Sequence, residues 1–160
     1  MNHFFINRHY LEELFKKDKE IMLDISSEGQ ATDKRPHIVT FKLKYKDNNH
    51  HFAIPLRSNI SKYRDRKTYH PLPELPKTIN KTKEDSIRGI DYSKVFPIDD
   101  KYTEKIRMNE LYKKYTFNYI KNNESLIKKE LQEFLDNYDK QHPNYKHTVD
   151  LEKLIENYKI

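Results

Sequence analysis

The sequence contains no cysteine, no tryptophan and only 2 glycines among its 160 residues. Without cysteine the chain can form neither a disulfide framework nor a thiolate metal site, and it has no cysteine nucleophile. Two glycines cannot build the glycine-rich loops that bind nucleotide phosphates, and no HExxH pattern occurs. His50 and His51 are neighbours in an expected strand, so their side chains point to opposite faces and cannot chelate together. We therefore expect no metal and no cofactor.

Long apolar segments are also absent. No run approaches the roughly 18 residues that indicate a membrane helix, and the first residues lack the charged and then apolar pattern of a signal peptide. We therefore expect a cytoplasmic protein. At this length the chain should form one domain, residues 1–160, which is large enough to bury a core.

Charge is what the sequence has in abundance. Charged residues make up 35% of the chain, the formal net charge is +6, and 12 tyrosines with 8 phenylalanines supply much of the core material. A basic surface favours a polyanionic partner, nucleic acid first, although a lysine-rich proteome gives the same composition.

Residues 35–59 have the pattern of a β-hairpin. Apolar and polar side chains alternate on both arms, and residues 47–49 supply turn chemistry between them. If the two apolar sets share one face, the register places His37 opposite Ser58. Pro55 cannot donate to a ladder, so the second arm should be an edge or carry a bulge there.

The open end of this hairpin gathers polar residues. A bulge would re-aim Arg57 and Ser58, and a polar loop over residues 24–36 lets Arg35 and His37 meet them. We interpret His37, Arg57, Ser58 and Asn59 as the rim of an RNA-cleaving site. The alternative is an ordinary hairpin end with solvated side chains.

The region after the hairpin interleaves basic and aromatic residues. Phosphates require cations and unstacked bases require aromatic faces, so this composition suits single-stranded RNA. The alternative is a solvated charged loop. The candidate RNA-binding residues here are Lys62, Tyr63, Arg64, Arg66 and Lys67, with Arg35 and Asn59 from the hairpin end.

Two further residues attract attention by their surroundings. Tyr10 lies in the first turn of a helix that Asn7 can cap, with its ring either packed or presenting its hydroxyl to solvent. In the strand-like segment 87–98, Lys94 lies an even number of residues from apolar neighbours, so its side chain is expected on the same face of the strand as theirs. It therefore either snorkels or points into a site. From Lys105 onward the periodicity predicts amphipathic helices, one ending near Asn122, and a short last helix capped by Thr148 or Asp150.

These residue types fit RNA cleavage by the RNA's own 2′-hydroxyl. The reaction needs a base for the 2′ proton, an acid for the leaving 5′-oxygen, and cations for the charge that develops on phosphorus. His37 is the natural proton carrier near neutral pH, and Arg57 and Lys94 suit the charge-stabilising role. Ser58 and Asn59 can hold a phosphate oxygen or the 2′-hydroxyl by hydrogen bonds.

Three segments together resemble the ToxN/AbiQ family of type III toxin–antitoxin endoribonucleases. They are HFFINRHYLEELFKKD, FAIPLRSNI and RGIDYSKVFPI, and they come in the family's order. The resemblance covers roughly residues 1–120. It implies an α+β fold with a compact, strongly twisted antiparallel β-core surrounded by helices, and the C-terminal part should be helical.

The resemblance also implies an activity and a partner. Members cut RNA without metal, leave 2′,3′-cyclic phosphate and 5′-hydroxyl ends, and act in plasmid maintenance or phage defence. A repeated small pseudoknot RNA inhibits them in a closed RNA–protein assembly. Tyr10, Ser58 and Lys94 match the family's helix tyrosine, motif serine and strand lysine, and the family's basic residue before the first hairpin strand falls near His37 or Arg35.

The chain departs from the family where a lysine closely follows the motif serine. Asn59 and Ile60 stand there, so the cationic role moves to Arg57 or Lys62. Two other readings stay open from the residues alone. One is a non-catalytic RNA- or DNA-binding regulatory protein, and the other is a protein-interaction module that uses the helical half.

Overall fold

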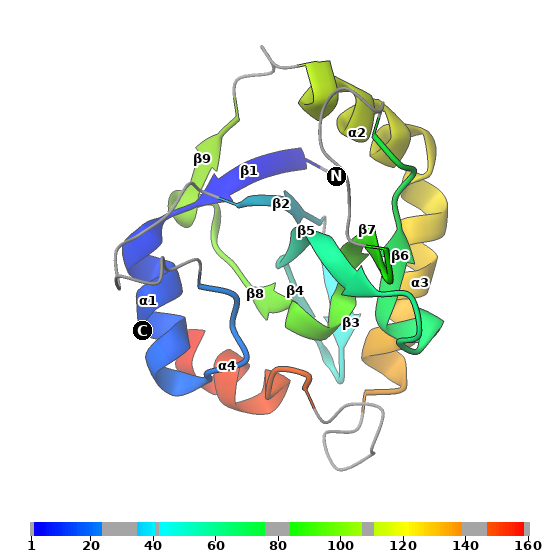
Figure 1. Ribbon diagram of the computed structural model, residues 1–160. Helices are drawn as coiled ribbons and strands as arrows, with labels where there is room; N and C mark the ends of the chain where they lie inside the picture. Colours follow the sequence, from blue (N-terminus) through cyan, green and yellow to red (C-terminus); the bar gives the residue numbers. More distant parts are fainter. Residues whose placement is uncertain are drawn as a thin grey trace.

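A seven-stranded antiparallel sheet organises the fold (Figure 1). The computed structural model describes residues 2–23, 35–40, 42–75, 84–106, 111–138 and 147–158. The strands follow the order β6-β7-β5-β2-β1-β9, and β8 also pairs with β5. Their bounds are β1 (Asn2–Ile6), β2 (Pro36–Val39), β5 (Phe52–Ser61), β6 (Tyr69–Pro71), β7 (Ser86–Asp91), β8 (Phe96–Pro97) and β9 (Thr103–Lys105). A separate hairpin, β3 (Leu43–Tyr45) with β4 (Asn48–His50), extends beyond the sheet.

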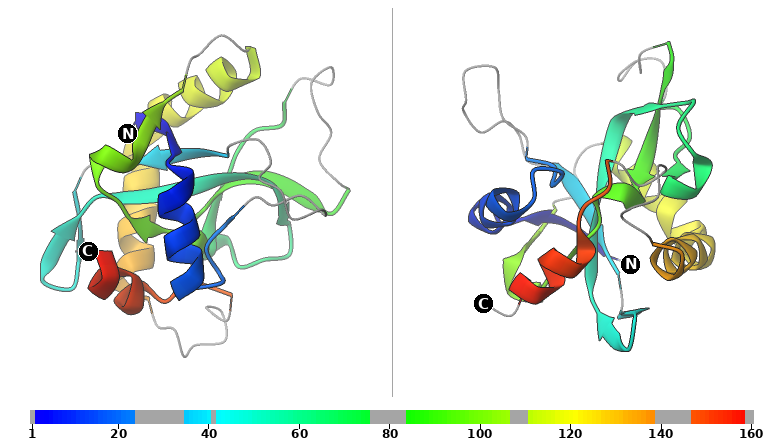
Figure 2. Two further views of the ribbon diagram at one scale, coloured as in Figure 1. Left: turned by 90° about the vertical axis from the view of Figure 1, so that its left-hand side faces the viewer. Right: turned by 90° about the horizontal axis from the view of Figure 1, so that it is seen from below.

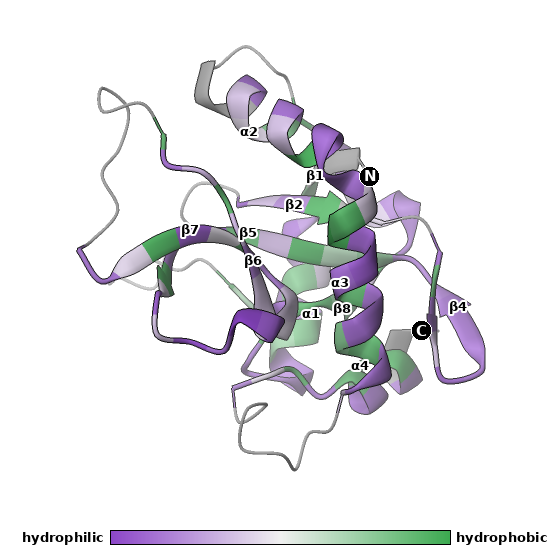
Figure 3. Ribbon diagram, turned by 90° about the vertical axis from the view of Figure 1, so that its right-hand side faces the viewer, coloured by the Kyte–Doolittle hydropathy of each residue, from purple (hydrophilic) through white to green (hydrophobic). Residues whose placement is uncertain are grey.

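Helices cover both faces of this sheet. Helices α1 (Arg8–Lys17) and α4 (Leu151–Tyr158) lie on one side, and α2 (Leu111–Asn122) and α3 (Glu124–Asp136) lie on the other (Figure 2). The helices bury apolar residues against the sheet, and Figure 3 shows hydrophilic and hydrophobic residues alternating along α3. No helix among the described residues is long and apolar enough to cross a membrane. The expected α+β architecture with helices in the C-terminal part is confirmed.

The expected hairpin exists, but its predicted register is wrong. His37 pairs with Pro55 rather than Ser58, and β3 and β4 meet around a two-residue turn in which Lys46 has a φ of 54°. The register was predicted on the assumption that only one face of each strand is buried. The first four residues of β5 are all buried, so β5 is covered on both faces and alternation there cannot select a register.

The bulge expected near Pro55 is present slightly farther along β5. Arg57 pairs with Gly89, and Ile60 pairs with Ile87, so Ser58 and Asn59 together face the single residue between those two partners. Pro55 itself pairs with β2, in a strand flanked on both sides, so it does not mark an edge. The bulge turns the exposed Ser58 and Asn59 out of the regular ladder.

The segment 87–98 is not one continuous strand. Strand β7 ends at Asp91, a 3-10 turn η2 (Tyr92–Lys94) follows, and β8 resumes the sheet. The period-two argument for Lys94 therefore fails, because Lys94 lies in the turn. Asp91 begins that turn by accepting a hydrogen bond from the backbone N–H of Ser93 at 3.1 Å.

Three other local expectations can be checked. A Cβ on Gly89 would lie 2.8 Å from Ile60 Cδ1 and 2.9 Å from the carbonyl oxygen of His70, which explains the glycine as a point of close approach. Residues 103–105 form β9, so the helical half begins later than expected. Asp150 rather than Thr148 caps α4, since its side chain accepts from the N–H of Lys153 at 3.1 Å. The sequence also predicts a helix break at His142–Pro143, and these residues lie outside the described part of the chain.

Candidate functional site

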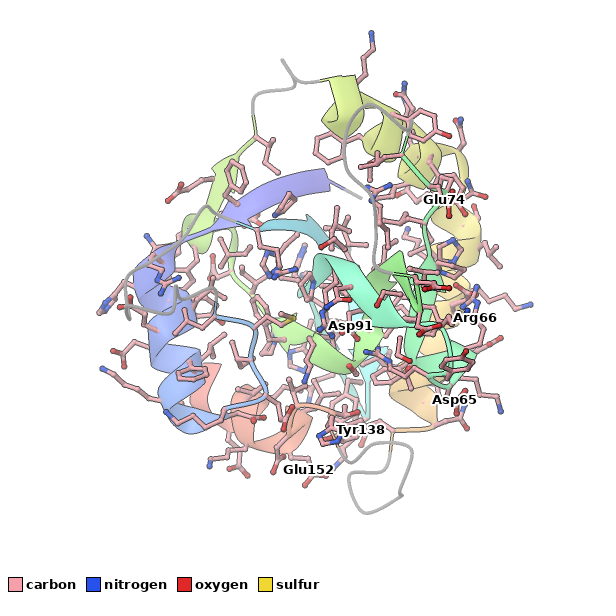
Figure 4. The ribbon with its side chains drawn as sticks, in the orientation of Figure 1. Asp65, Arg66, Glu74, Asp91, Tyr138 and Glu152 are labelled. Carbon is pink, nitrogen blue, oxygen red and sulfur yellow. The ribbon has the colours of Figure 1, made fainter. Side chains whose placement is uncertain are left out.

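A buried carboxylate, Asp91, binds polar side chains from both ends of the bulge (Figure 4). Arg57 donates to its Oδ2 at 2.8 Å, and Arg64 donates to Oδ2 at 3.1 Å and also to Oδ1. The Ser93 hydroxyl donates to Oδ1 at 2.6 Å. Strand β5 and the segment after it are therefore joined to the end of β7 through one side chain.

Electrostatics favour the ionised form of Asp91. Burial raises its pKa, but the hydrogen bond and charge of Arg64, with the hydrogen bonds of Ser93 and Arg57, outweigh burial and lower the pKa below its ordinary value. The carboxylate thus stays charged and holds Arg57 in place, one residue before the bulge.

Arg57 also lines a hollow of about 400 Å³ between the end of α1 and the turn η2. Lys94 lines the same hollow, so the structure brings together the two cations that the sequence nominated for charge stabilisation. The other lining residues come from α1, the segment after it and the approach to α4: Phe15, Lys19, Glu20, Ile21, Met22, Leu23 and His147.

The ammonium of Lys94 is held from two sides. Its Nζ lies 2.6 Å from Glu20 Oε2 and 2.7 Å from the carbonyl oxygen of His147. The Lys94 side chain is 12% exposed, so it is oriented into the hollow rather than spread on the surface. The His147 side chain is 79% exposed, and its Nδ1 lies 4.0 Å from Glu20 Oε1. A lysine, a carboxylate and an accessible imidazole therefore converge here.

His37 and Tyr10 lie in the interior instead of at a rim. His37 is fully buried, with Nδ1 3.0 Å from the carbonyl oxygen of Arg35 and its ring edge against Phe96. The rim position expected for His37 followed from the wrong register. The hydroxyl of Tyr10 donates to the carbonyl oxygen of Pro97 at 2.6 Å, and its ring stacks on Tyr102.

The basic segment after β5 divides into residues with different surroundings. Arg64 is bound to Asp91, Thr68 and Ser93, and Arg66 donates to Glu130 Oε2 at 3.1 Å. Lys67 and Tyr63 are exposed. Lys62 Nζ lies 5.3 Å from the centroid of the Tyr63 ring. The surface-facing members are therefore Lys62, Tyr63 and Lys67, with Arg66 about half exposed.

Other expected site residues take supporting positions. Arg35 donates to the carbonyl oxygen of Leu56 at 3.0 Å, which ties the start of β2 to β5 beside Arg57. His70, in the same polar region as the basic segment, is buried with Nδ1 2.6 Å from Glu130 Oε1. This second carboxylate joins β6 to α3 on the face opposite α1.

Sequence reasoning missed Asp91, Glu20 and His147. Asp91 is the last residue of β7 and carries no motif, and its two arginine partners lie 34 and 27 residues before it. Glu20 and the carbonyl of His147 lie 74 and 53 residues from Lys94, so no local spacing could connect them. Among the described residues, no group of three or more His, Cys, Asp or Glu side chains could hold a metal ion.

Comparison with known proteins gives a likeness in structure alone. No protein-family model matches the chain, and no curated protein matches its sequence. One solved structure concerns a bacterial antiviral system regulated by a processed non-coding RNA. It has a TM-score of 0.72 and 18% identity, over 99% of this chain and 98% of that chain.

Two further structures agree. One concerns bacterial type III toxin–antitoxin systems and selective toxin inhibition by a non-coding RNA pseudoknot, with a TM-score of 0.67 and 17% identity over 99% of this chain and 97% of that chain. The other is AbiQ, a lactococcal anti-phage endoribonuclease of the type III toxin–antitoxin system, with a TM-score of 0.71 and 14% identity over 99% of this chain and 95% of that chain. The fold that the three sequence segments predicted is confirmed along nearly the whole chain.

Proposed function

We propose that this chain is an endoribonuclease toxin of the ToxN/AbiQ family, held in check by an antitoxin RNA. The observation that carries the proposal is the fold shared over 99% of the chain with proteins of RNA-regulated toxin and antiviral systems. The bulge at Ser58 and Asn59, and the hollow with Arg57 and Lys94, support it independently. The antitoxin would carry repeated pseudoknots in a closed assembly, and the role would be phage defence or plasmid maintenance.

The proposed reaction needs no metal. The 2′-oxygen of the RNA loses its proton to a base and bonds to phosphorus, the bond from phosphorus to the 5′-oxygen breaks, and that oxygen takes a proton from an acid. The products carry a 2′,3′-cyclic phosphate and a 5′-hydroxyl. Arg57 and Lys94 would stabilise the charge on phosphorus, and Ser58 and Asn59 would hold its oxygens.

Proton transfer needs a group that RNA can reach. His37 is fully buried, whereas the imidazole of His147 is 79% exposed beside Lys94. We therefore assign the proton-carrying role to His147, and to His37 and Tyr10 the role of supporting the strands that hold the site. The RNA contacts would come from Lys62, Tyr63, Arg66 and Lys67, while Arg64 acts through Asp91.

The test is incubation of the purified protein with a long RNA in excess EDTA, followed by chemical typing of the new ends. Wild type should leave cyclic phosphates, and Ser58→Ala and His147→Ala should each cut about 100-fold or more slowly. Ser61→Ala, on the same strand beyond the bulge, and His9→Ala, on the exposed side of α1, are the matched controls and should cut normally.

Intact RNA after incubation with folded wild-type protein would overturn the endoribonuclease assignment. In that case, salt-dependent binding of the uncut RNA would identify the chain as a non-catalytic RNA-binding regulator.

A further inference from the structure

The hollow between α1 and η2 has two chemically different walls. One wall is apolar and is formed by Phe15, Ile21, Met22 and Leu23, of which Ile21 belongs to the core and Phe15 and Leu23 pack against it. A second wall carries Arg57 and Lys94 together with the carboxylate of Glu20, and Lys19 extends from α1 beside Phe15. Apolar and cationic side chains in one hollow suit a ligand with a flat, weakly polar part attached to an anion.

We propose that this hollow binds one unstacked nucleotide, with the phosphate at Lys94 and Arg57 and the base against Phe15, Met22 and Leu23. The assignment rests on the proposed function in that the nucleotide would normally be part of an RNA. It adds to that function a binding site for one base next to the bulge. This site would determine which nucleotide of the RNA is placed there.

The cationic wall is arranged to receive a single phosphate. Glu20 and the carbonyl of His147 take two of the three donors of the Lys94 ammonium, at 2.6 and 2.7 Å, and so fix its direction. Asp91 fixes Arg57 in the same way at 2.8 Å, and the guanidinium has further donors beyond this bond. Both cations are therefore oriented before any ligand arrives, which lowers the entropy lost on binding.

The apolar wall suits a base. The ring of Phe15 is half-buried, with Lys19 Nζ 4.2 Å from its centroid, so an aromatic surface and a cation lie together in the lining of the hollow. Bases that leave their stack are held by such aromatic and apolar side chains. The volume of about 400 Å³ lies at the lower end of small-molecule sites, which gives room for one nucleotide and excludes a paired duplex.

Binding can be measured apart from cleavage. We would titrate the whole protein with each of the four nucleoside 3′-monophosphates, with inorganic phosphate and with the free nucleosides, by calorimetry and by amide NMR. At least one nucleotide should bind about tenfold more tightly than phosphate or its own nucleoside, and it should shift the amide signals of Ile21, Met22 and Leu23.

Variants test the contributions of the apolar wall and the cationic wall separately. Phe15→Leu should weaken nucleotide binding about five- to tenfold and leave phosphate binding unchanged, because only the base loses a contact. Lys94→Gln should weaken both about tenfold. Lys19→Gln should weaken the nucleotide severalfold, whereas Lys16→Gln, one turn earlier on α1 and outside the hollow, should have no effect. Unchanged NMR spectra outside the hollow confirm folding of each variant.

Failure of this assignment is distinct from failure of the proposed function. If the protein cuts RNA but all nucleotides bind no more tightly than phosphate, or Phe15→Leu weakens phosphate equally, the nucleotide site is overturned and the endoribonuclease stands. If nucleotides bind with the expected pattern but RNA stays intact, the nucleotide site stands and the proposed activity is overturned.

Discussion

Asp91 is the residue on which most of the polar geometry depends. Replacing it with asparagine leaves the guanidinium groups of Arg57 and Arg64 partly buried without their countercharge. We expect Asp91→Asn to lower the free energy of unfolding by about 3 kcal/mol at pH 7. Since the pKa of Asp91 is lowered on folding, its contribution is complete above the ordinary carboxyl value of 3.8 and is lost as the pH falls below that value.

Urea unfolding of wild type and Asp91→Asn between pH 7 and pH 3 checks this. The difference between the two proteins should be constant at neutral pH and should shrink toward pH 3, because the Asp91 carboxyl takes up a proton in the unfolded chain at a higher pH than in the folded protein. A difference that grows on acidification would contradict the ionised state of Asp91.

A second prediction at the level of the residue concerns His37, which was expected to carry protons in the reaction but lies inside the protein. A fully buried imidazole that packs against Phe96 supports the core. His37→Ala should therefore reduce stability by about 2–4 kcal/mol, and any lost RNA cleavage should parallel the lost folded fraction. Thermal unfolding with cleavage normalised to folded protein tests this, and His9→Ala is the exposed control. If fully folded His37→Ala protein loses cleavage, His37 instead takes part in the reaction.

At the scale of the element, the bulge in β5 is the feature that distinguishes the site from an ordinary sheet. Ser58 and Asn59 face one residue of β7, so deleting Asn59 should restore a regular ladder while Ile60 keeps its partner Ile87. The deletion variant should stay folded and lose about 100-fold or more of its RNA cleavage, because Ser58 changes direction. Circular dichroism and the cleavage assay measure the two effects, and Asn49 deletion in the separate β3–β4 hairpin is the control. If the Asn59 deletion variant keeps full activity, the bulge plays no part in RNA cleavage.

The elements also show where sequence reasoning succeeds and where it stops. The spacing of Tyr10, Leu11 and Leu14 identifies α1, because one buried face gives a clear period. In β5 both faces are buried, so the same logic finds the strand but not its register. The turn η2 has a local signal in the pair Asp91 and Ser93, but the bonds from Asp91 to its distant arginines are tertiary and have no local signature. The Arg57–Lys94 pair was predicted from residue type, whereas Glu20 could only be seen in the fold.

For the whole molecule, the net charge of +6 has a measurable consequence for RNA binding. Surface cations at Lys19, Lys62, Lys67 and Arg66 are exposed and lie on the parts of the chain assigned to RNA. Contact with about four phosphates of a single strand gives a slope of about −2.8 in log affinity against log salt, so affinity should fall about 50-fold between 50 and 200 mM salt.

Binding of a labelled single-stranded RNA to cleavage-inactive Ser58→Ala protein over a salt series measures this slope. Lys67→Gln should reduce its magnitude by about 0.7, because one phosphate contact is lost, and should weaken all RNA sequences alike. Lys101→Gln, exposed beside the first turn of α1 and not among the residues of the hollow or the basic segment, is the control and should leave the slope unchanged. A slope near zero would mean that the charge does not act through phosphates, and the RNA contacts would then have to be sought in stacking at Tyr63 and Phe15.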